Sequence, residues 1–167
     1  DFVEKELKEN GVDLVLGVKV ESIEPGLKVN YVSVKDGAKG TVEGDVVLMA
    51  GGRAPNTRGI GLDTIGVKMD RKGFVEIDGL CRTNVPGVYA IGDCVFGKAQ
   101  LAHTASAMGE VAAENICGHD SVYVEKTNPT CVYIEPEAAS VGLTEEQCKA
   151  QGIDYKVGKF PMAANGK

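Results

Sequence analysis

A run of five apolar residues, Val46 to Ala50, followed by two glycines, limits the possible folds more than any other feature of the sequence. Consecutive apolar residues suit a strand that is covered on both faces, as in a parallel sheet flanked by helices. A second apolar run, Val88 to Ile91, ends in a similar way at Gly92-Asp93. Two such strands predict an α/β fold in which a turn follows each strand.

The residues before this run predict a small antiparallel meander. Phe2, Val3 and Leu7 lie at helical spacing, and Gly11 follows where a left-handed helix end would need it. Two turn signals, Pro25-Gly26 and Asp36-Gly37, separate short half-exposed strands. The elements expected here are a helix end at 2–10 and strands at 12–16, 19–23, 27–34 and 46–50.

A change of pattern at residues 51–57 predicts a crossover into a new domain. Beyond it, apolar residues recur at helical intervals from Thr104 to Cys117, with Gly118 as the expected stop. Thr144-Glu145-Glu146-Gln147 has the form of a capping box. The elements expected are strands at 73–78, 88–91, 130–134 and 155–160, and helices at 104–117 and from Thr144 to Gly152.

Composition and charge exclude several classes of function. With 24 acidic against 18 basic side chains, the formal net charge of -6 argues against a nucleic-acid binder. The longest apolar stretch is far shorter than the about 20 residues that a membrane helix needs. Five dispersed cysteines and two histidines show no metal-ligand spacing. We therefore expect a cytoplasmic protein with reduced structural thiols, no metal site, and no contact with nucleic acid or membrane.

A few residues could contact a ligand, and each also has a simpler explanation. Asp93 ends a predicted buried strand, where ligands of open α/β sheets gather, but turn or capping aspartates are also common there. Small residues near Thr104 would let a positive helix end approach a ligand, or would only pack tightly. Gly51-Gly52 could pass close to a ligand or simply turn. We expect His103 to cap or pack rather than to act as a base.

Two motifs resemble the linked signatures of the pyridine nucleotide-disulfide oxidoreductases. They are Ala50 to Thr57 (AGGRAPNT) and Thr83 to Asp93 (TNVPGVYAIGD). Leu101-Ala102-His103 is similar to the dihydrolipoamide dehydrogenase branch, whereas glutathione reductases tend to carry Leu-Thr-Pro there. Three further segments resemble the opening of the dimerisation domain of that family: 133–137 (YIEPE), 141–145 (VGLTE) and 158–166 (GKFPMAANG).

The resemblance implies three parts of an FAD/NAD-linked reductase fold. These are the C-terminal part of the NAD-binding domain at 1–57, the central FAD-contacting domain at 58–125, and the start of an α+β dimerisation (interface) domain at 126–167. In such proteins the aspartate that matches Asp93 holds the ribityl chain of FAD. The backbone around Leu101, Ala102 and His103 faces the flavin pyrimidine ring, and Gly52 matches a residue that lies against the nicotinamide nucleotide.

The resemblance also implies an activity and partners for the whole protein. Electrons would pass from dihydrolipoamide through a redox disulfide and FAD to NAD, a reaction that serves cell redox homeostasis. A homodimer that works with the lipoyl domains of a 2-oxoacid dehydrogenase complex is the expected assembly.

Several parts of the family pattern are absent from these 167 residues. The two glycine-rich nucleotide fingerprints and the redox pair Cys-x-x-x-x-Cys should precede Asp1, and the His-Glu pair that manages thiol protons should follow Lys167. We therefore expect an inactive internal fragment with no catalytic residue and with weak or no FAD binding. Two alternatives stay open: a fragment of a glutathione- or mercuric-type flavoprotein reductase, and a non-catalytic nucleotide-binding or dimerisation module.

Overall fold

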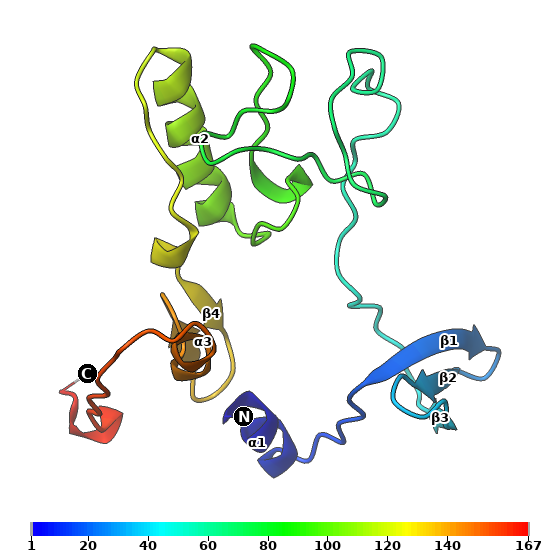
Figure 1. Ribbon diagram of the computed structural model, residues 1–167. Helices are drawn as coiled ribbons and strands as arrows, with labels where there is room; N and C mark the ends of the chain where they lie inside the picture. Colours follow the sequence, from blue (N-terminus) through cyan, green and yellow to red (C-terminus); the bar gives the residue numbers. More distant parts are fainter. Residues whose placement is uncertain (1, 167) are drawn as a thin grey trace. The chain divides into compact units, whose positions relative to one another are not determined.

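The computed structural model describes residues 2–166, and the chain divides into two compact units. The first, here called the meander unit, contains the residues up to Arg53 together with Tyr133–Ala138. The second, here called the helix unit, contains Ala54–Val132 and the residues from Ala139 onward. Helices and strands both occur, in agreement with the predicted α/β class (Figure 1).

The meander unit begins with helix α1 (Phe2–Glu9), as the sequence predicts. Its end is closed by Gly11, which has a φ of 77° in the left-handed region. This conformation lets the Val12 N–H donate to the Leu7 carbonyl at 3.0 Å, so a terminal carbonyl of the helix is satisfied.

Three antiparallel strands follow; the first two confirm the strands predicted at 19–23 and 27–34, while the third, at 39–43, was not predicted. They are β1 (Val18–Glu24), β2 (Lys28–Ser33) and β3 (Lys39–Glu43), paired in the order β1-β2-β3. The second turn uses the predicted Asp36-Gly37 pair: the Asp36 carboxylate accepts from the Ala38 N–H at 3.1 Å, and Gly37 has a φ of 73°. The turn chemistry therefore sets the β2–β3 pairing from local sequence alone.

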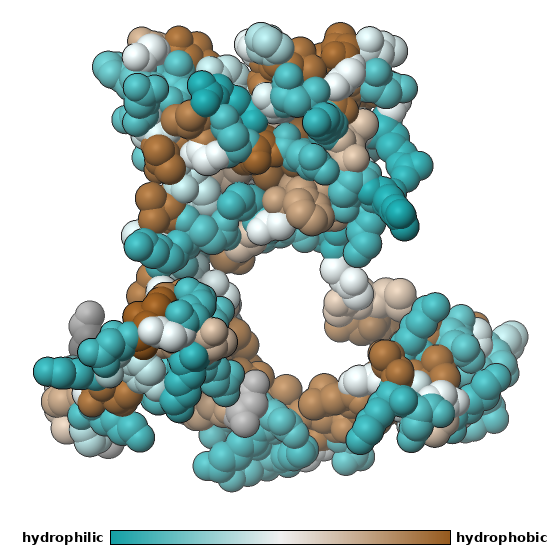
Figure 2. Space-filling view, viewed as in Figure 1, coloured by the Kyte–Doolittle hydropathy of each residue, from teal (hydrophilic) through white to brown (hydrophobic). Residues whose placement is uncertain are grey.

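The strands predicted at 12–16 and 46–50 are wrong. Residues 12–16 are irregular, and Val46 and Leu48 expose 83% and 85% of their surface. A strand needs hydrogen-bonded neighbours, and no described strand pairs with either segment. Both runs therefore remain extended chain, and their apolar side chains are among those that reach the surface (Figure 2).

The core of the helix unit lies under helix α2 (Ala102–Ile116). Residues 104, 108, 111 and 112 of α2 are buried, which is the spacing of one helix face. Met108, Val111 and Ala112 pack with Cys81 and Val95 in one hydrophobic cluster. The helix confirms the prediction and starts two residues earlier than expected, while Gly118 follows its end with a φ of 88°.

The strands predicted at 73–78 and 88–91 are present only as isolated bridges. Val75 pairs with Met69 and with Val95, and Tyr89 pairs with Arg82. Val75 is buried, whereas the run 88–91, which was predicted to be a buried strand, contains no buried residue and leaves 40% of Ile91 exposed. Among residues 2–166 no longer ladder extends these bridges.

The last part of the chain is built from short elements. They are η2 (Glu125–Thr127), β4 (Thr130–Val132), β5 (Ala138–Ser140), α3 (Glu145–Ala150) and η3 (Met162–Ala164). β4 pairs with β5 and ends two residues before the predicted Ile134. The capping box at Thr144 is confirmed, because its hydroxyl accepts from the Gln147 N–H and the Gln147 side chain accepts from the Thr144 N–H. The strand predicted at 155–160 is wrong, since that segment is irregular.

The described part of the chain contains neither a membrane-spanning helix nor a metal-binding cluster. No helix there has the length and apolar character needed to cross a bilayer. The His, Cys, Asp and Glu side chains of residues 2–166 form no group of three or more that could hold a metal ion.

Candidate cofactor-binding site

Asp93 lies in a single turn, η1 (Gly92–Cys94), that packs against helix α2. Gly92 has a φ of 73°, and a Cβ atom added to it would lie 3.1 Å from Cβ of Ala105. A side chain at this position would therefore be strained and would also press on the helix. Glycine is what lets η1 and the first turns of α2 approach so closely.

The backbone around Asp93 is fixed from two directions. The Val75 N–H donates to the Cys94 carbonyl at 2.8 Å, and the Phe96 N–H donates to the Val75 carbonyl at 2.9 Å. On the other side, Nε2 of Gln100 donates to the Asp93 carbonyl at 3.2 Å. Asp93 is half-buried and lies on a turn whose backbone is fixed by these hydrogen bonds.

The N-terminus of α2 is suited to an electron-rich ligand. Its N-cap is Leu101, which offers no side-chain cap, and the first turn contains no acidic residue. The first intrahelical bond runs from the Ala105 N–H to the Leu101 carbonyl, so the N–H groups of Ala102, His103 and Thr104 precede the helical ladder. Ala102 and His103 are exposed. The positive end of a 15-residue helix is thus left without a charged cap.

The His103 ring contacts a backbone carbonyl group. Its Nε2 lies 2.8 Å from the Pro129 carbonyl oxygen. A carbonyl can only accept, so Nε2 must carry the proton in this contact. The contact supports the prediction that His103 packs rather than acts as a base.

Gly52 belongs to the meander unit, apart from the other four predicted site residues. It is exposed, has a φ of 99°, and a Cβ atom added to it would meet no atom within 4 Å. Its backbone conformation therefore favours glycine, while nothing around it fills the space in front of the backbone.

Cys81 and Cys148 are buried and Cys94 is half-buried, as structural thiols would be, whereas Cys117 and Cys131 are exposed. All five are free. Burial raises the pKa of the Cys81 thiol, and the negative charge of Asp78 raises it further. Burial likewise raises the pKa of Cys94, with a smaller contribution from Asp93. A raised pKa keeps a thiol protonated and unreactive, as the sequence predicted.

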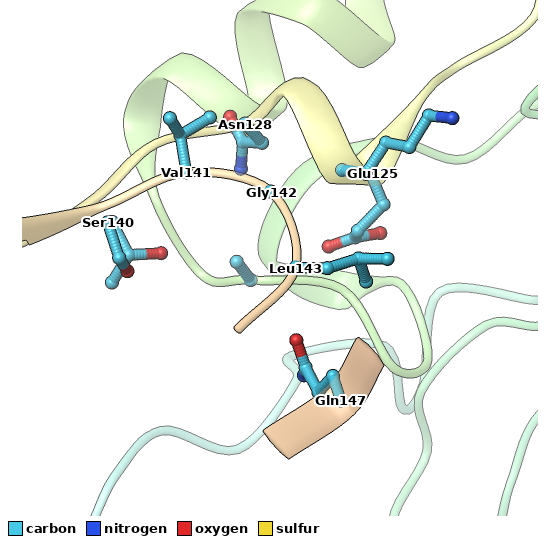
Figure 3. A pocket seen from close by; sticks show the side chains of 10 residues that line it. Glu125, Asn128, Ser140, Val141, Gly142, Leu143 and Gln147 are labelled. Carbon is cyan, nitrogen blue, oxygen red and sulfur yellow. The ribbon is translucent and has the colours of Figure 1, made fainter. Parts of the chain in front are cut away.

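Several cavities of the helix unit are lined by residues other than Asp93 and 101–103. One, of about 320 Å³, lies between Ala99, residues 125–130 and residues 140–147 (Figure 3). Another, of about 360 Å³, is lined mainly by apolar residues, among them Val75, Tyr89 and Ile91. Neither contains any of the five predicted site residues.

The arrangement fits contact with one side of a flavin rather than its full enclosure. An anchored carboxylate and free helical N–H groups match the hydroxyl and carbonyl groups of such a cofactor. Hydrogen-bond donors and an acceptor are thus available at one edge of an α/β unit. Such an arrangement suggests a protein that binds a cofactor at the start of a helix.

Comparison with models of protein families identifies the class of protein. Residues 1–109 match the model described as pyridine nucleotide-disulphide oxidoreductase, and residues 128–167 match the dimerisation domain of the same group. The chain belongs to the pyridine nucleotide-disulphide oxidoreductase family. This confirms the resemblance inferred from the two motifs.

The chain is similar to several dihydrolipoyl dehydrogenases. It is 46% identical to that of Geobacillus stearothermophilus over 169 residues, which cover 99% of this chain and 35% of that protein. With the protein of Cupriavidus necator the identity is 42% over 167 residues, covering 98% and 35%. The chain therefore spans about a third of the length of these relatives.

Solved structures show the same fold. LpdA from Mycobacterium tuberculosis aligns with a TM-score of 0.74 at 32% identity, covering 90% of this chain and 32% of that one. RclA from Escherichia coli, an HOCl-induced flavoprotein disulfide reductase, aligns with the same TM-score at 27% identity, covering 98% and 37%. The chain therefore represents part of a FAD/NAD-linked reductase fold.

Proposed function

We propose that this chain contributes part of the flavin-binding surface of a dihydrolipoamide dehydrogenase. The observation that carries the proposal is the approach of η1 to α2 at Gly92 and Ala105, which puts Asp93 and the uncapped helix start in one unit. The dihydrolipoyl dehydrogenase names of the relatives support the choice within the family.

Each predicted site residue receives a role in binding. The Asp93 carboxylate accepts hydrogen bonds from ribityl hydroxyls of FAD. The backbone of Leu101, Ala102 and His103 faces the pyrimidine ring, where the helix dipole favours electron-rich oxygen atoms. Gly52 gives the nicotinamide nucleotide of NAD close access to the backbone. FAD, when bound, supplies the electron transfer between the thiol substrate and NAD.

No residue of this chain is assigned to the disulfide chemistry. The buried thiol of Cys81 and the half-buried thiol of Cys94 have raised pKa values, and the five cysteines include no Cys-x-x-x-x-Cys pair. The chain's part is therefore to bind and orient, and residues outside these 167 carry out thiol exchange.

The same reasoning extends to organisation and partners. We assign 1–57 to the NAD-binding domain, 58–125 to the FAD-contacting domain and 126–167 to the dimerisation domain, and the match at 128–167 supports a homodimer. Five free thiols suit a reducing compartment, the cytoplasm, where lipoyl domains of a 2-oxoacid dehydrogenase complex would be the partner.

A related flavoprotein reductase is the second candidate. The RclA structure aligns with this chain as well as LpdA does, with a TM-score of 0.74 in each case. Because the two alignments are equally good, the structural comparison does not favour dihydrolipoamide over another substrate of the family. The substrate assay below separates the two.

The test uses the protein expressed from its natural gene. We expect bound flavin and NAD reduction by dihydrolipoamide, with little activity on glutathione or metal ions. Asp93→Ala should lower FAD affinity about tenfold, the effect of losing a hydrogen bond of about 1.4 kcal/mol. The matched control Asp120→Ala removes an exposed acidic residue of the same unit and should leave FAD affinity unchanged. Absence of flavin, or a flavoprotein active only on another substrate, would contradict the proposal.

A further inference from the structure

The segment that follows α2 runs back along the helix toward its first turn (Figure 1). We call residues 121–129 the return strap. Its beginning is fixed near the C-terminal half of α2, where Nδ2 of Asn115 donates to the Ser121 carbonyl at 2.7 Å. The Tyr123 N–H then donates to the Gly79 carbonyl at 2.9 Å.

The end of the return strap binds the first turn of α2 at two consecutive residues. Nδ2 of Asn128 donates to Oγ1 of Thr104, and the Pro129 carbonyl accepts from Nε2 of His103. Thr104 is fully buried, with 0% of its surface exposed. Removing Asn128 would therefore deprive a buried hydroxyl of its donor.

The loop between η1 and α2 is tied to the same strap. Nζ of Lys98 lies 2.8 Å from the Glu125 carboxylate and 5.2 Å from the centre of the Tyr123 ring. Glu125 and Asn128 come from one stretch of the strap, as Figure 3 shows. The strap thus touches the loop before α2 and the first turn of α2 itself.

We propose that Asn128 is a positioning residue for the flavin-facing turn. Through Thr104 it holds the first turn of α2 in the orientation that presents the Ala102 and His103 N–H groups. The inference rests on the proposed function, because it concerns the same edge. It adds a residue that lies outside that edge, 24 positions along the chain from Thr104.

The geometry explains why a side chain in the strap would matter for binding. Hydrogen bonds from helix N–H groups depend on their direction, so a small tilt of the first turn weakens them. The turn has no side-chain cap of its own at Leu101. Asn128 and Pro129 therefore supply polar contacts that hold this turn against the strap.

The test measures FAD binding in the protein expressed from its natural gene. Thr104→Val and Asn128→Ala should each weaken FAD affinity about tenfold and alter the visible circular dichroism of the bound flavin. The double variant should be at most about twofold weaker than either single variant, because the two residues act through one hydrogen bond. Thr104→Ser keeps the hydroxyl and should restore affinity to within about twofold of the parent protein.

A matched control separates positioning from stability. Thr57 is also buried, at 5% exposure, and its hydroxyl donates to the Gly73 carbonyl at 2.6 Å in the same unit. Thr57→Val should lower the unfolding midpoint yet leave FAD affinity of the folded protein and its flavin spectrum unchanged. If Asn128→Ala does not fold, Asn128→Leu retains the side-chain volume without the donor and serves in its place.

The possible results are distinguishable. If the unsubstituted protein binds no FAD, the proposed function fails and this inference fails with it. If it binds FAD while Thr104→Val and Asn128→Ala bind equally well with the same spectrum, only the positioning role is overturned. Additive losses in the double variant would also overturn it, since they would show that the two residues act independently.

Discussion

The meander unit and the helix unit are each stabilised internally by a different kind of interaction. Every described residue classed as buried hydrophobic lies in the helix unit; they are Val67, Val75, Cys81, Val95, Met108, Val111, Ala112 and Cys148. The meander unit instead has the two antiparallel ladders of β1–β3 and no buried residue among those described. One unit relies on side-chain burial and the other on backbone pairing.

The two units differ in which residues specify them: neighbouring residues specify the meander, whereas residues far apart in the chain specify the core of the helix unit. Turn residues such as Asp36-Gly37 specify a hairpin from a few adjacent positions. A core such as the one around Met108 joins residues far apart in the chain, from Cys81 to Ala112. Short exposed sheets are marginal alone, so we expect the helix unit to provide most of the stability of this chain.

Substitution of Met108 should have the largest effect. Met108 is fully buried in the cluster under α2, and Met108→Ala should cost about 2–5 kcal/mol through lost burial and a cavity. Met49 of the meander unit is 75% exposed, so Met49→Ala should change stability by about 0.5 kcal/mol or less. Urea unfolding midpoints measure both, and equal losses would contradict the contrast between the units.

Substitution of Gly92 should come next. An alanine there adds left-handed strain and a contact 3.1 Å from Cβ of Ala105, for a total of about 2–4 kcal/mol. Gly97 also has a positive φ, 69°, but a Cβ atom there would meet nothing within 4 Å. Gly97→Ala should therefore show the backbone cost alone, about 1 kcal/mol. Similar losses in thermal unfolding for both variants would show that the approach of η1 to α2 contributes nothing.

The elements that could be predicted from sequence are those with local signals. The helices at 2–9 and 102–116, the meander and the Thr144 cap all begin or end at turn, glycine or capping residues. The runs at 46–50 and 88–91 were predicted as buried strands because their residues are consecutively apolar, but Val46 and Leu48 are 83% and 85% exposed and Ile91 is 40% exposed, so this pattern predicted neither pairing nor burial. Among the described residues, the segments 73–78 and 88–91 contain only isolated bridges, two at Val75 and one at Tyr89.

The candidate site could be predicted only in part for the same reason. The sequence predicted the start of α2 to within two residues, but the strand expected to end before Asp93 is present only as an isolated bridge at Tyr89. The contact between Gly92 and Ala105, and that between Asn128 and Thr104, join positions that no local spacing rule relates. The roles of Gly52, Asp93, Leu101, Ala102 and His103 toward NAD and FAD stay predictions.

The capping box of α3 tests a local signal inside the helix unit. Thr144→Ala removes the hydroxyl that accepts from the Gln147 N–H and should cost about 1 kcal/mol. Thr144→Ser retains the acceptor and should cost only a few tenths of that amount. Hydrogen exchange at the amides of Gln147 and Cys148 measures the fraying of this six-residue helix directly. No change in exchange with Thr144→Ala would mean that burial of Cys148 alone holds α3.

Acid should loosen one aspartate turn in each unit, with the smallest effect of all. In the meander unit, hydrogen bonds from Ser33 and the Ala38 N–H lower the pKa of Asp36. In the helix unit, burial raises the pKa of Asp78, but hydrogen bonds from Arg82 and the Leu80 N–H outweigh it and leave the pKa lowered.

A lowered carboxyl pKa stabilises the fold above the unfolded value of 3.8, and this stability is lost as pH falls further through the folded value. Hydrogen exchange at Ala38 and Leu80, corrected for the intrinsic pH dependence of exchange, should therefore accelerate below about pH 3.8. Asp36→Asn and Asp78→Asn keep an acceptor without the charge, so each should flatten the response at its own turn alone. Because both turns are local and exposed, the response should be alike in the two units, in contrast to the effects of core substitutions. A response confined to Asp78 would show that turn strength also depends on the packing that the meander unit lacks.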